Sequence, residues 1–241
     1  MKKAEVCQLI RDIGIIPAIK VSSAEDAHFA AEAVIRGGIP IVEITMTVPE
    51  AVELISHLVR HHGERMVVGA GTVLDTETAK RALDAGASFL TAPGFDFNIL
   101  EFAVHENLAI LPGSLTPTEV VTAWRVGADF VKVFPCPRVG GDKYIKDLKT
   151  ALPQIPLIAA GGVNQQTAAS FILAGATAIG VGTELIPPDA IQLRQSERIQ
   201  ELAHRFVGFV QDARARLGPP QETVTWIKTD FLKLDKRPPK R

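Results

Sequence analysis

The chain has 241 residues, of which 46% are hydrophobic, and this combination suits one large domain with a sizeable core. Its 26 basic and 27 acidic residues leave a net charge of -1, which argues against nucleic acid as a general partner. The two cysteines, Cys7 and Cys136, lie far apart and lack CxxC spacing, so neither a disulfide framework nor a thiolate metal site is indicated. Because no apolar run reaches membrane-spanning length and the first residues lack a signal-peptide pattern, we expect a soluble cytoplasmic protein without membrane partners.

The strands and helices are predicted to alternate along the chain. Residues 2–13 are expected to form an extra helix ahead of the first strand, where it could cap the N-terminal mouth of a barrel. From there to residue 183, short β-branched runs alternate with Ala-rich amphipathic segments, which makes eight consecutive βα units. The predicted strands cover residues 15–20, 39–45, 66–70, 88–92, 108–112, 129–134, 156–160 and 177–182.

Capping residues mark the boundaries of the helices between these strands. Ser22-Ser23, Asp75 and Thr116 each precede an acidic first turn, as residues that cap helix N-termini do. Glycine ends several helical segments, because it adopts the left-handed conformation without a Cβ clash. These glycine endings lie within residues 34–38, 83–87, 124–128 and 172–176.

The repeat predicts an α/β fold made of one (β/α)8 TIM barrel. Strands that are apolar along their whole length are typical of a parallel sheet buried on both faces. Eight units favour a closed barrel over residues 1–217, and an open doubly wound sheet is the alternative. The composition changes in residues 218–241, a C-terminal extension that is basic at its end. Its apolar side chains could dock on a neighbouring surface: Trp226, Ile227, Phe231 and Leu232.

A lysine inside the apolar stretch FVKVFP is the main candidate for catalysis. Lys132 falls near the carboxyl end of the sixth predicted strand, the end at which active sites of such barrels form. Partial desolvation disfavours its charged form and leaves more free amine to attack a carbonyl carbon, which is Schiff-base chemistry. Glu43 is a second ionisable group in an apolar strand at a comparable height. The pair predicts imine formation with proton transfer, and a structural buried ion pair is the alternative.

Two late glycine loops suggest a site for an anionic group. Gly161 and Gly162 follow the seventh predicted strand, ahead of a helix expected near Asn164. Gly182 and Thr183 follow the eighth strand, and exposed backbone N–H groups in such loops can hold phosphate or carboxylate oxygens. The glycines could also simply permit tight turns.

No metal site is expected. His28, His61, His62 and His105 are predicted on helix surfaces or helix ends, without HxxxH pairing or an acidic cluster nearby. Cys136 is expected to be a small apolar filler rather than a nucleophile.

Several separated motifs resemble the 2-keto-3-deoxy-6-phosphogluconate (KDPG) and 4-hydroxy-2-oxoglutarate (KHG) aldolase family, which are class I aldolases with a (β/α)8 barrel. The resemblance runs from about residue 13 to 210. The motifs are VEIT (42–45), VGAGTVLD (68–75), APGF (92–95), LPGSLTPTE (111–119), FVKVFP (130–135), AAGGV (159–163) and VGTEL (181–185).

The resemblance implies a role for each matching residue. Lys132 matches the Schiff-base lysine and Glu43 the general acid and base of an enzyme that cleaves a 2-keto-3-deoxy sugar acid, 6-phosphorylated or not, or KHG, to pyruvate and an aldehyde. A homotrimer that needs no cofactor or metal is implied as well. The residues expected to bind substrate are Lys20, Thr72, Pro93, Phe134, Gly161, Gly162, Gly182 and Thr183.

Several positions depart from the pattern of the KDPG enzymes. Thr47 stands where their arginine binds the pyruvyl carboxylate, and Lys20 falls where a related branch, the 2-dehydro-3-deoxy-6-phosphogalactonate aldolases, has a first-strand cation. Glu184 lies beside the expected phosphate site, where a carboxylate repels a dianion. Two alternatives therefore stay open: another phosphate-binding barrel enzyme that forms no imine, and a non-catalytic ligand-binding barrel descended from the aldolases.

Overall fold

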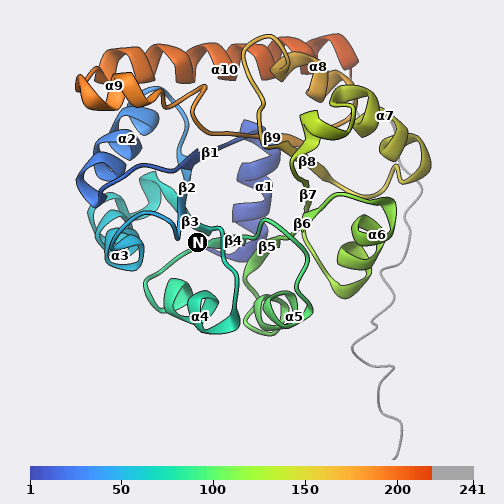
Figure 1. Ribbon diagram of the computed structural model, residues 1–241, viewed down its shortest axis with the longest axis horizontal. Coiled ribbons are helices and arrows are strands. Elements are labelled where there is room, and N and C mark those ends of the chain that lie inside the picture. The colour runs from blue at the N-terminus through green and yellow to red at the C-terminus, as the bar shows by residue number, and fades with distance from the viewer. Residues whose placement is uncertain (219–241) are drawn as a thin grey trace, which may run out of the picture.

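The structure is a computed structural model that describes residues 1–218. Within them the chain forms one barrel of parallel strands surrounded by helices (Figure 1). The expected docking of Trp226, Ile227, Phe231 and Leu232 concerns positions outside the described residues.

The strands form a single sheet in which every neighbouring pair is parallel. Their order around the sheet is β5-β4-β3-β2-β1-β9-β8-β7-β6. The strands are β1 (Ile15–Ile19), β2 (Ile41–Thr45), β3 (Val67–Gly71), β4 (Phe89–Thr91), β5 (Ala109–Leu111), β6 (Gly113–Ser114), β7 (Val131–Val133), β8 (Leu157–Ala160) and β9 (Ala178–Val181).

The sheet closes on itself at Pro112, which separates β5 from β6. β5 pairs with β4 on one side and β6 pairs with β7 on the other, so β5 lies within the fifth predicted strand (108–112) and β6 continues that strand beyond its predicted end. Proline has no N–H to donate, but the Pro112 carbonyl still accepts a hydrogen bond of 3.0 Å from the backbone N–H of Lys132. The closed barrel with eight predicted strands is therefore confirmed, and the open doubly wound alternative is wrong.

Helices cover the outside of the barrel and lie between consecutive strands along the chain. A short 3-10 turn, Gly63–Arg65, follows α3, and another, Cys136–Val139, follows β7. The helices are α1 (Lys3–Ile13), α2 (Ala24–Arg36), α3 (Ala51–His62), α4 (Thr76–Asp84), α5 (Phe97–His105), α6 (Pro117–Val126), α7 (Asp142–Ala151), α8 (Ala168–Leu173), α9 (Pro188–Gln192) and α10 (Ser196–Leu217).

The predicted capping residues begin three of these helices. The side chains of Ser23 and Asp75 accept hydrogen bonds of 3.0 and 2.6 Å from the backbone N–H groups three residues later, and Thr116 forms a capping box with Glu119. The helix expected near Asn164 begins only at Ala168. The Asn164 side chain instead accepts backbone hydrogen bonds from the turn before the helix, which delays its start.

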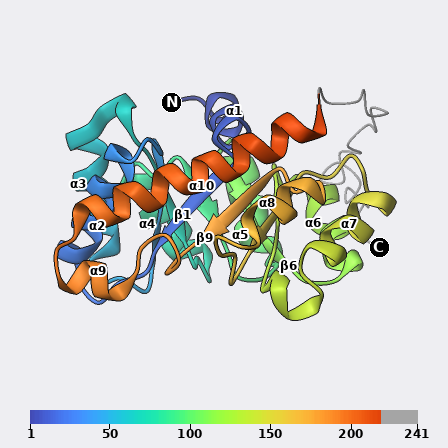
Figure 2. The same ribbon diagram turned by 90° about the horizontal axis from the view of Figure 1, so that it is seen from above.

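The N-terminal helix closes the end of the barrel where the strands begin, as expected (Figure 2). Val6 and Ile10 of α1 are fully buried against the barrel, and Lys3 forms an ion pair of 2.9 Å with Asp129 just before β7. Arg214 of α10 donates hydrogen bonds to the carbonyls of Arg11 and Asp12 at the end of α1. With one mouth covered, a cavity for small molecules has to open at the other.

The long helix α10 packs across α2 and α8 and completes the outer layer. Among residues 1–218, no helix combines the length and apolar character needed to cross a bilayer.

Candidate active site

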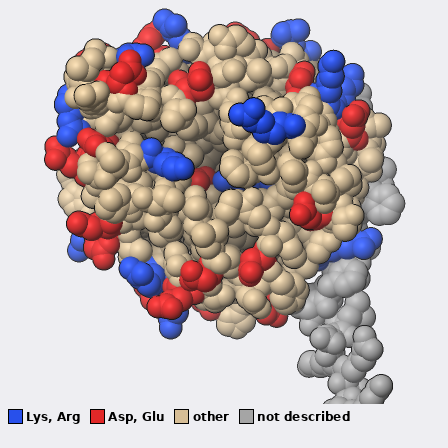
Figure 3. Space-filling view, viewed as in Figure 1, with Lys and Arg blue, Asp and Glu red and all other residues tan. Residues whose placement is uncertain are grey.

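A cavity of about 270 Å³ opens at the carboxyl ends of the strands. Figure 3 shows this face hollowed at its centre, with acidic and basic side chains inside the hollow and around its rim. All ten predicted site residues line this cavity, although their places in the sequence span more than half the chain. They are Lys20, Glu43, Thr72, Pro93, Lys132, Phe134, Gly161, Gly162, Gly182 and Thr183.

The lysine and the glutamate come from opposite sides of the barrel. Glu43 lies on β2 and Lys132 on β7, and these strands are separated by β1, β9 and β8 in one direction and by β3, β4 and the β5–β6 strand in the other. Their side chains meet near the barrel axis, where Lys132 Nζ lies 3.9 Å from Glu43 Oε1. The side chains are 14% and 6% exposed, respectively.

The lysine ammonium has few close partners. Lys132 Nζ donates one long hydrogen bond of 3.4 Å to the hydroxyl of Thr91, and it lies 5.4 Å from the centre of the Phe134 ring. A structural ion pair is expected to bring its charged groups within direct hydrogen-bonding distance, below about 3 Å. At 3.9 Å, and beside an open cavity, the amine and the carboxylate leave room for a reacting group.

The carboxylate of Glu43 depends on a glycine in the next strand. A Cβ atom at Gly71 would collide with the Glu43 carboxylate, so only glycine leaves space for this side chain at the end of β3. With its backbone included, the Glu43 residue is 4% exposed and therefore almost fully buried. The GAGT motif therefore serves first to admit the carboxylate into the cavity.

Thr72, the residue after Gly71, has an unusual backbone conformation. Its φ of 56° lies in the left-handed region, which a β-branched residue rarely adopts. Strain of this kind occurs mainly where surrounding structure holds a residue for a function. Here it places Thr72 at the wall of the cavity.

Lys20 and Thr47 occupy different places relative to the cavity. Lys20, just beyond the end of β1, is exposed and lines the cavity. Thr47 does not line it; its hydroxyl lies 2.8 Å from that of Thr45, which itself donates to the carbonyl of Ile19. Lys20 is thus a cation available to a substrate carboxylate in the absence of an arginine at position 47.

The glycine loops form the wall nearest β8 and β9. Gly161 and Gly162 have φ values of 90° and 121°, and a Cβ at Gly161 would lie 2.7 Å from the Phe134 ring, so glycine is required there. Thr183 and Glu184 are exposed at the mouth of the cavity.

Sequence reasoning missed Thr91, the hydrogen-bond partner of Lys132. Thr91 ends β4, is only 1% exposed and lines the cavity. A threonine at the carboxyl end of a barrel strand was the available signal, since active sites form at that end.

Cys136 is buried, as expected for a filler. Burial raises the pKa of its thiol to about 12, so the nucleophilic thiolate is strongly disfavoured near neutral pH.

One acidic side chain lies beside two of the histidines, where the sequence predicted no acidic cluster. Glu32 of α2 faces the end of α3, where its Oε1 lies 2.8 Å from His62 Nε2. The expected absence of HxxxH pairing is wrong, because His57 lies four residues before His61 on α3. This group lies outside the cavity described above.

Comparisons with known proteins agree with this geometry. The family model "KDPG and KHG aldolase" matches residues 6–202. The 2-dehydro-3-deoxy-6-phosphogalactonate aldolase of Escherichia coli (strain K12) is 30% identical over 201 residues, which cover 83% of this chain and 94% of that protein.

Two solved structures are similar as well. One is a KDPG aldolase from Legionella pneumophila with pyruvate captured at low pH as a covalent carbinolamine intermediate; it is 27% identical, with a TM-score of 0.76 over 82% of this chain and 96% of that chain. The other is a cube-shaped, highly porous protein cage designed by fusing symmetric oligomeric domains. It is 29% identical, with a TM-score of 0.77 over 85% of this chain and 74% of that chain. With a family match over most of its length and a lysine and a glutamate together in the cavity, this chain is an aldolase that belongs to the KDPG and KHG aldolase family.

Proposed function

We propose that this cavity cleaves a 2-keto-3-deoxy sugar acid, or KHG, to pyruvate and an aldehyde through an imine on Lys132. The observation that carries the proposal is the position of Lys132 Nζ, enclosed in the cavity, 3.9 Å from Glu43 and held by a single long hydrogen bond. The related Legionella pneumophila enzyme was captured with pyruvate as a covalent carbinolamine, which supports the same chemistry here.

In the first step, the free amine of Lys132 attacks the C2 ketone of the substrate. The resulting carbinolamine takes up a proton, loses water and becomes a protonated imine, whose positive nitrogen attracts electrons from the neighbouring C3–C4 bond.

In the second step, Glu43 acts through a water molecule as general base and removes the proton of the C4 hydroxyl group. The C3–C4 bond breaks, its electron pair forms the enamine, and the aldehyde leaves. Protonation of the enamine at C3 and hydrolysis of the imine then release pyruvate and return the free amine. The Gly71 position allows the Glu43 carboxylate to reach the reacting atoms.

Lys20 is proposed to bind the substrate carboxylate, helped by Thr72. Lys20 lines the cavity just beyond the end of β1, and β1 pairs with β2, the strand that carries Glu43. Pro93 and Phe134 supply apolar surface in the lining of the cavity.

The distal end of the substrate is proposed to lie against Gly161, Gly162, Gly182 and Thr183. Glu184 at this mouth repels a phosphate dianion, so Glu184→Gln is expected to raise kcat/KM for a 6-phosphorylated substrate more than for an unphosphorylated one. Equal effects on the two substrates would place the distal group elsewhere.

We also propose that the protein is a cytoplasmic homotrimer, as the family resemblance implies. The similarity to a cage built from symmetric oligomeric domains supports a symmetric assembly. Light scattering on the purified full chain tests it, since a monomer mass would contradict the proposal.

Intact mass spectrometry after incubation with pyruvate and borohydride tests the imine mechanism. A reduced pyruvyl adduct that maps to Lys132 is the expected result. A folded protein without an adduct would contradict the mechanism and favour a barrel that binds ligands without forming an imine. Lys132→Arg is the matched control, because it keeps a positive charge but cannot form the imine.

A further inference from the structure

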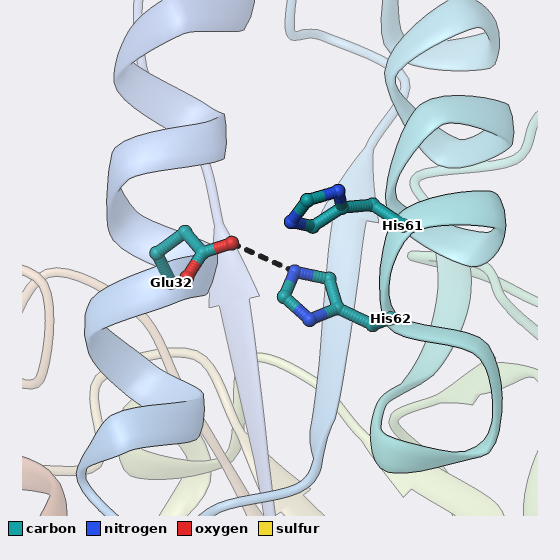
Figure 4. A group of neighbouring side chains, drawn as sticks. All are labelled: Glu32, His61 and His62. Carbon is teal, nitrogen blue, oxygen red and sulfur yellow. Dashed lines mark ion pairs between the residues drawn. The ribbon is translucent and has the colours of Figure 1, made fainter.

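A cluster of histidines around one glutamate lies between α2 and α3, on the outside of the barrel. Figure 4 shows Glu32 extending from α2 towards His61 and His62, which end α3. Because helices α2 and α3 end near the start of the strands, this cluster lies at the opposite end of the barrel from the cavity. The aldol reaction described above does not use these residues.

The donor atoms of the three side chains converge. Glu32 Oε1 lies 2.8 Å from His62 Nε2, and one donor atom from each of Glu32, His61 and His62 falls within 4.8 Å of the other two. Within residues 1–218, this is the one group of three histidine, cysteine or acidic residues that converges in this way. Ligands of a tetrahedral zinc ion lie about 3.3 Å apart, so a small movement of the exposed His61 side chain is enough to complete the geometry.

His62 contributes the second observation. Its side chain is only 5% exposed, and its Nε2 atom makes no hydrogen bond within the described residues, although it lies 2.8 Å from Glu32 Oε1. A buried polar nitrogen without a partner is costly. A cation held between the imidazole lone pair and the carboxylate oxygen would satisfy both atoms.

Neighbouring side chains orient the glutamate and surround the site with further imidazole groups. Arg36 donates a hydrogen bond of 3.5 Å to Oε2 of Glu32, which leaves Oε1 for the histidines. His28 Nε2 lies 4.0 Å from the same Oε1 atom, and the His57 ring stacks on that of His61 at 5.8 Å. Outer partners of this kind orient metal ligands in proteins.

We propose that Glu32, His61 and His62 bind a divalent transition metal of the zinc type and thereby join α2 to α3. Imidazole nitrogen and carboxylate oxygen are the ligands that suit zinc, and three protein ligands leave one position for water or for His28. The metal stabilises the outer layer next to β2, the strand that carries Glu43.

Equilibrium dialysis of the metal-stripped full chain against Zn²⁺, followed by elemental analysis, tests the proposal. The expected result is one bound zinc ion per chain. Glu32→Gln and His61→Ala are expected to lower the affinity at least about tenfold, because each removes a ligand. Absence of saturable binding, or undiminished binding in both variants, would overturn the proposal.

His105→Ala is the matched control. His105 lies 2.9 Å from Glu106, so it offers the same imidazole and carboxylate pair without a third donor, and it is expected to bind zinc as the unsubstituted chain does. An affinity that falls equally in this variant would mean that the zinc binds to surface histidines in general, against the proposal.

A second measurement guards against loss of folding in the variants. Glu32→Gln preserves the shape of the side chain, and circular dichroism shows whether it is folded. Zn²⁺ is expected to raise the melting temperature of the unsubstituted chain and of His105→Ala, but much less that of Glu32→Gln. An equal rise in all three proteins would contradict the assignment of Glu32 as a ligand.

Discussion

Lys132 and Lys149 are two shielded lysines in different regions of the molecule, and their surroundings differ in a useful way. Lys149 lies near the end of α7, and its ammonium donates hydrogen bonds of 2.6 and 2.8 Å to the carbonyls of Pro153 and Ile155. Lys132 has one hydroxyl at 3.4 Å and one carboxylate at 3.9 Å, and it faces a cavity. Lys149 ties a loop to its helix, whereas Lys132 has donor capacity left for a ligand.

Burial and a shifted pKa do not by themselves identify a catalytic lysine. Burial lowers the pKa of Lys149 to about 8, a shift of the kind often found at active sites. Yet Lys149 does not line the cavity, and two carbonyls occupy its donors. Incomplete hydrogen bonding next to an open volume is the more informative sign.

Replacing the cavity lysine is expected to have the largest effect on turnover. Lys132→Met should lower kcat at least about 10⁴-fold and abolish borohydride trapping with pyruvate, because it removes the amine that is proposed to form the imine. Steady-state kinetics and mass spectrometry measure both. An adduct that persists in this variant would show that another lysine is the nucleophile and would remove the distinction between the two lysines.

Glu43→Gln should separate imine formation from proton transfer. We expect kcat to fall by about 10²- to 10⁴-fold, the usual contribution of a general acid or base, while trapping with pyruvate continues. Turnover and adduct yield are measured on the same preparation. Unchanged turnover would show that the carboxylate 3.9 Å from Lys132 is only a structural partner.

Gly71→Ala tests whether the space for Glu43 matters. The added Cβ would press on the Glu43 carboxylate, and a displacement of about 1 Å costs up to about 10²-fold in rate. The drop in kcat should largely disappear in the Glu43→Gln background, where no catalytic carboxylate remains to be displaced. Equal drops in both backgrounds would point to a general distortion of β3.

Lys149→Met should have the smallest effect on turnover, within about twofold, because the side chain lies outside the cavity. The substitution should instead change how stability depends on pH. Steady-state kinetics at neutral pH provide the first test. A loss of kcat as large as that of Lys132→Met would show that Lys149 also takes part in turnover.

The sign of the pH effect follows from the lowered pKa of Lys149. Between about 8 and 10.5, the unfolded chain keeps its proton on Lys149 whereas the folded chain has lost it, so the free energy of unfolding rises with pH through this window. Lys149→Met lacks this contribution. Urea unfolding of both proteins should show a difference in stability that grows from pH 8 towards pH 10; a constant difference would contradict the assigned pKa.

Much of the candidate site could be predicted from the sequence because local patterns carry it. The apolar strands, the glycine turns and the capping residues are short-range features, and active sites of such barrels lie at the carboxyl ends of the strands. A lysine at position 132 and a glutamate at position 43 therefore mark that end before any contact is known. The match to family motifs adds the expected chemistry.

The sequence by itself determined the barrel repeat and the two ionisable residues at its carboxyl end, since periodicity and strand-end position are properties of neighbouring residues. Only the tertiary structure decided which side chains meet. Closure at Pro112 and the strand order bring Lys132 to Glu43 and Thr91, and the packing of α2 on α3 brings Glu32 to His62. These contacts join residues 30 to 89 positions apart along the chain, as the numbering shows, and their distances depend on register and packing that no local pattern encodes.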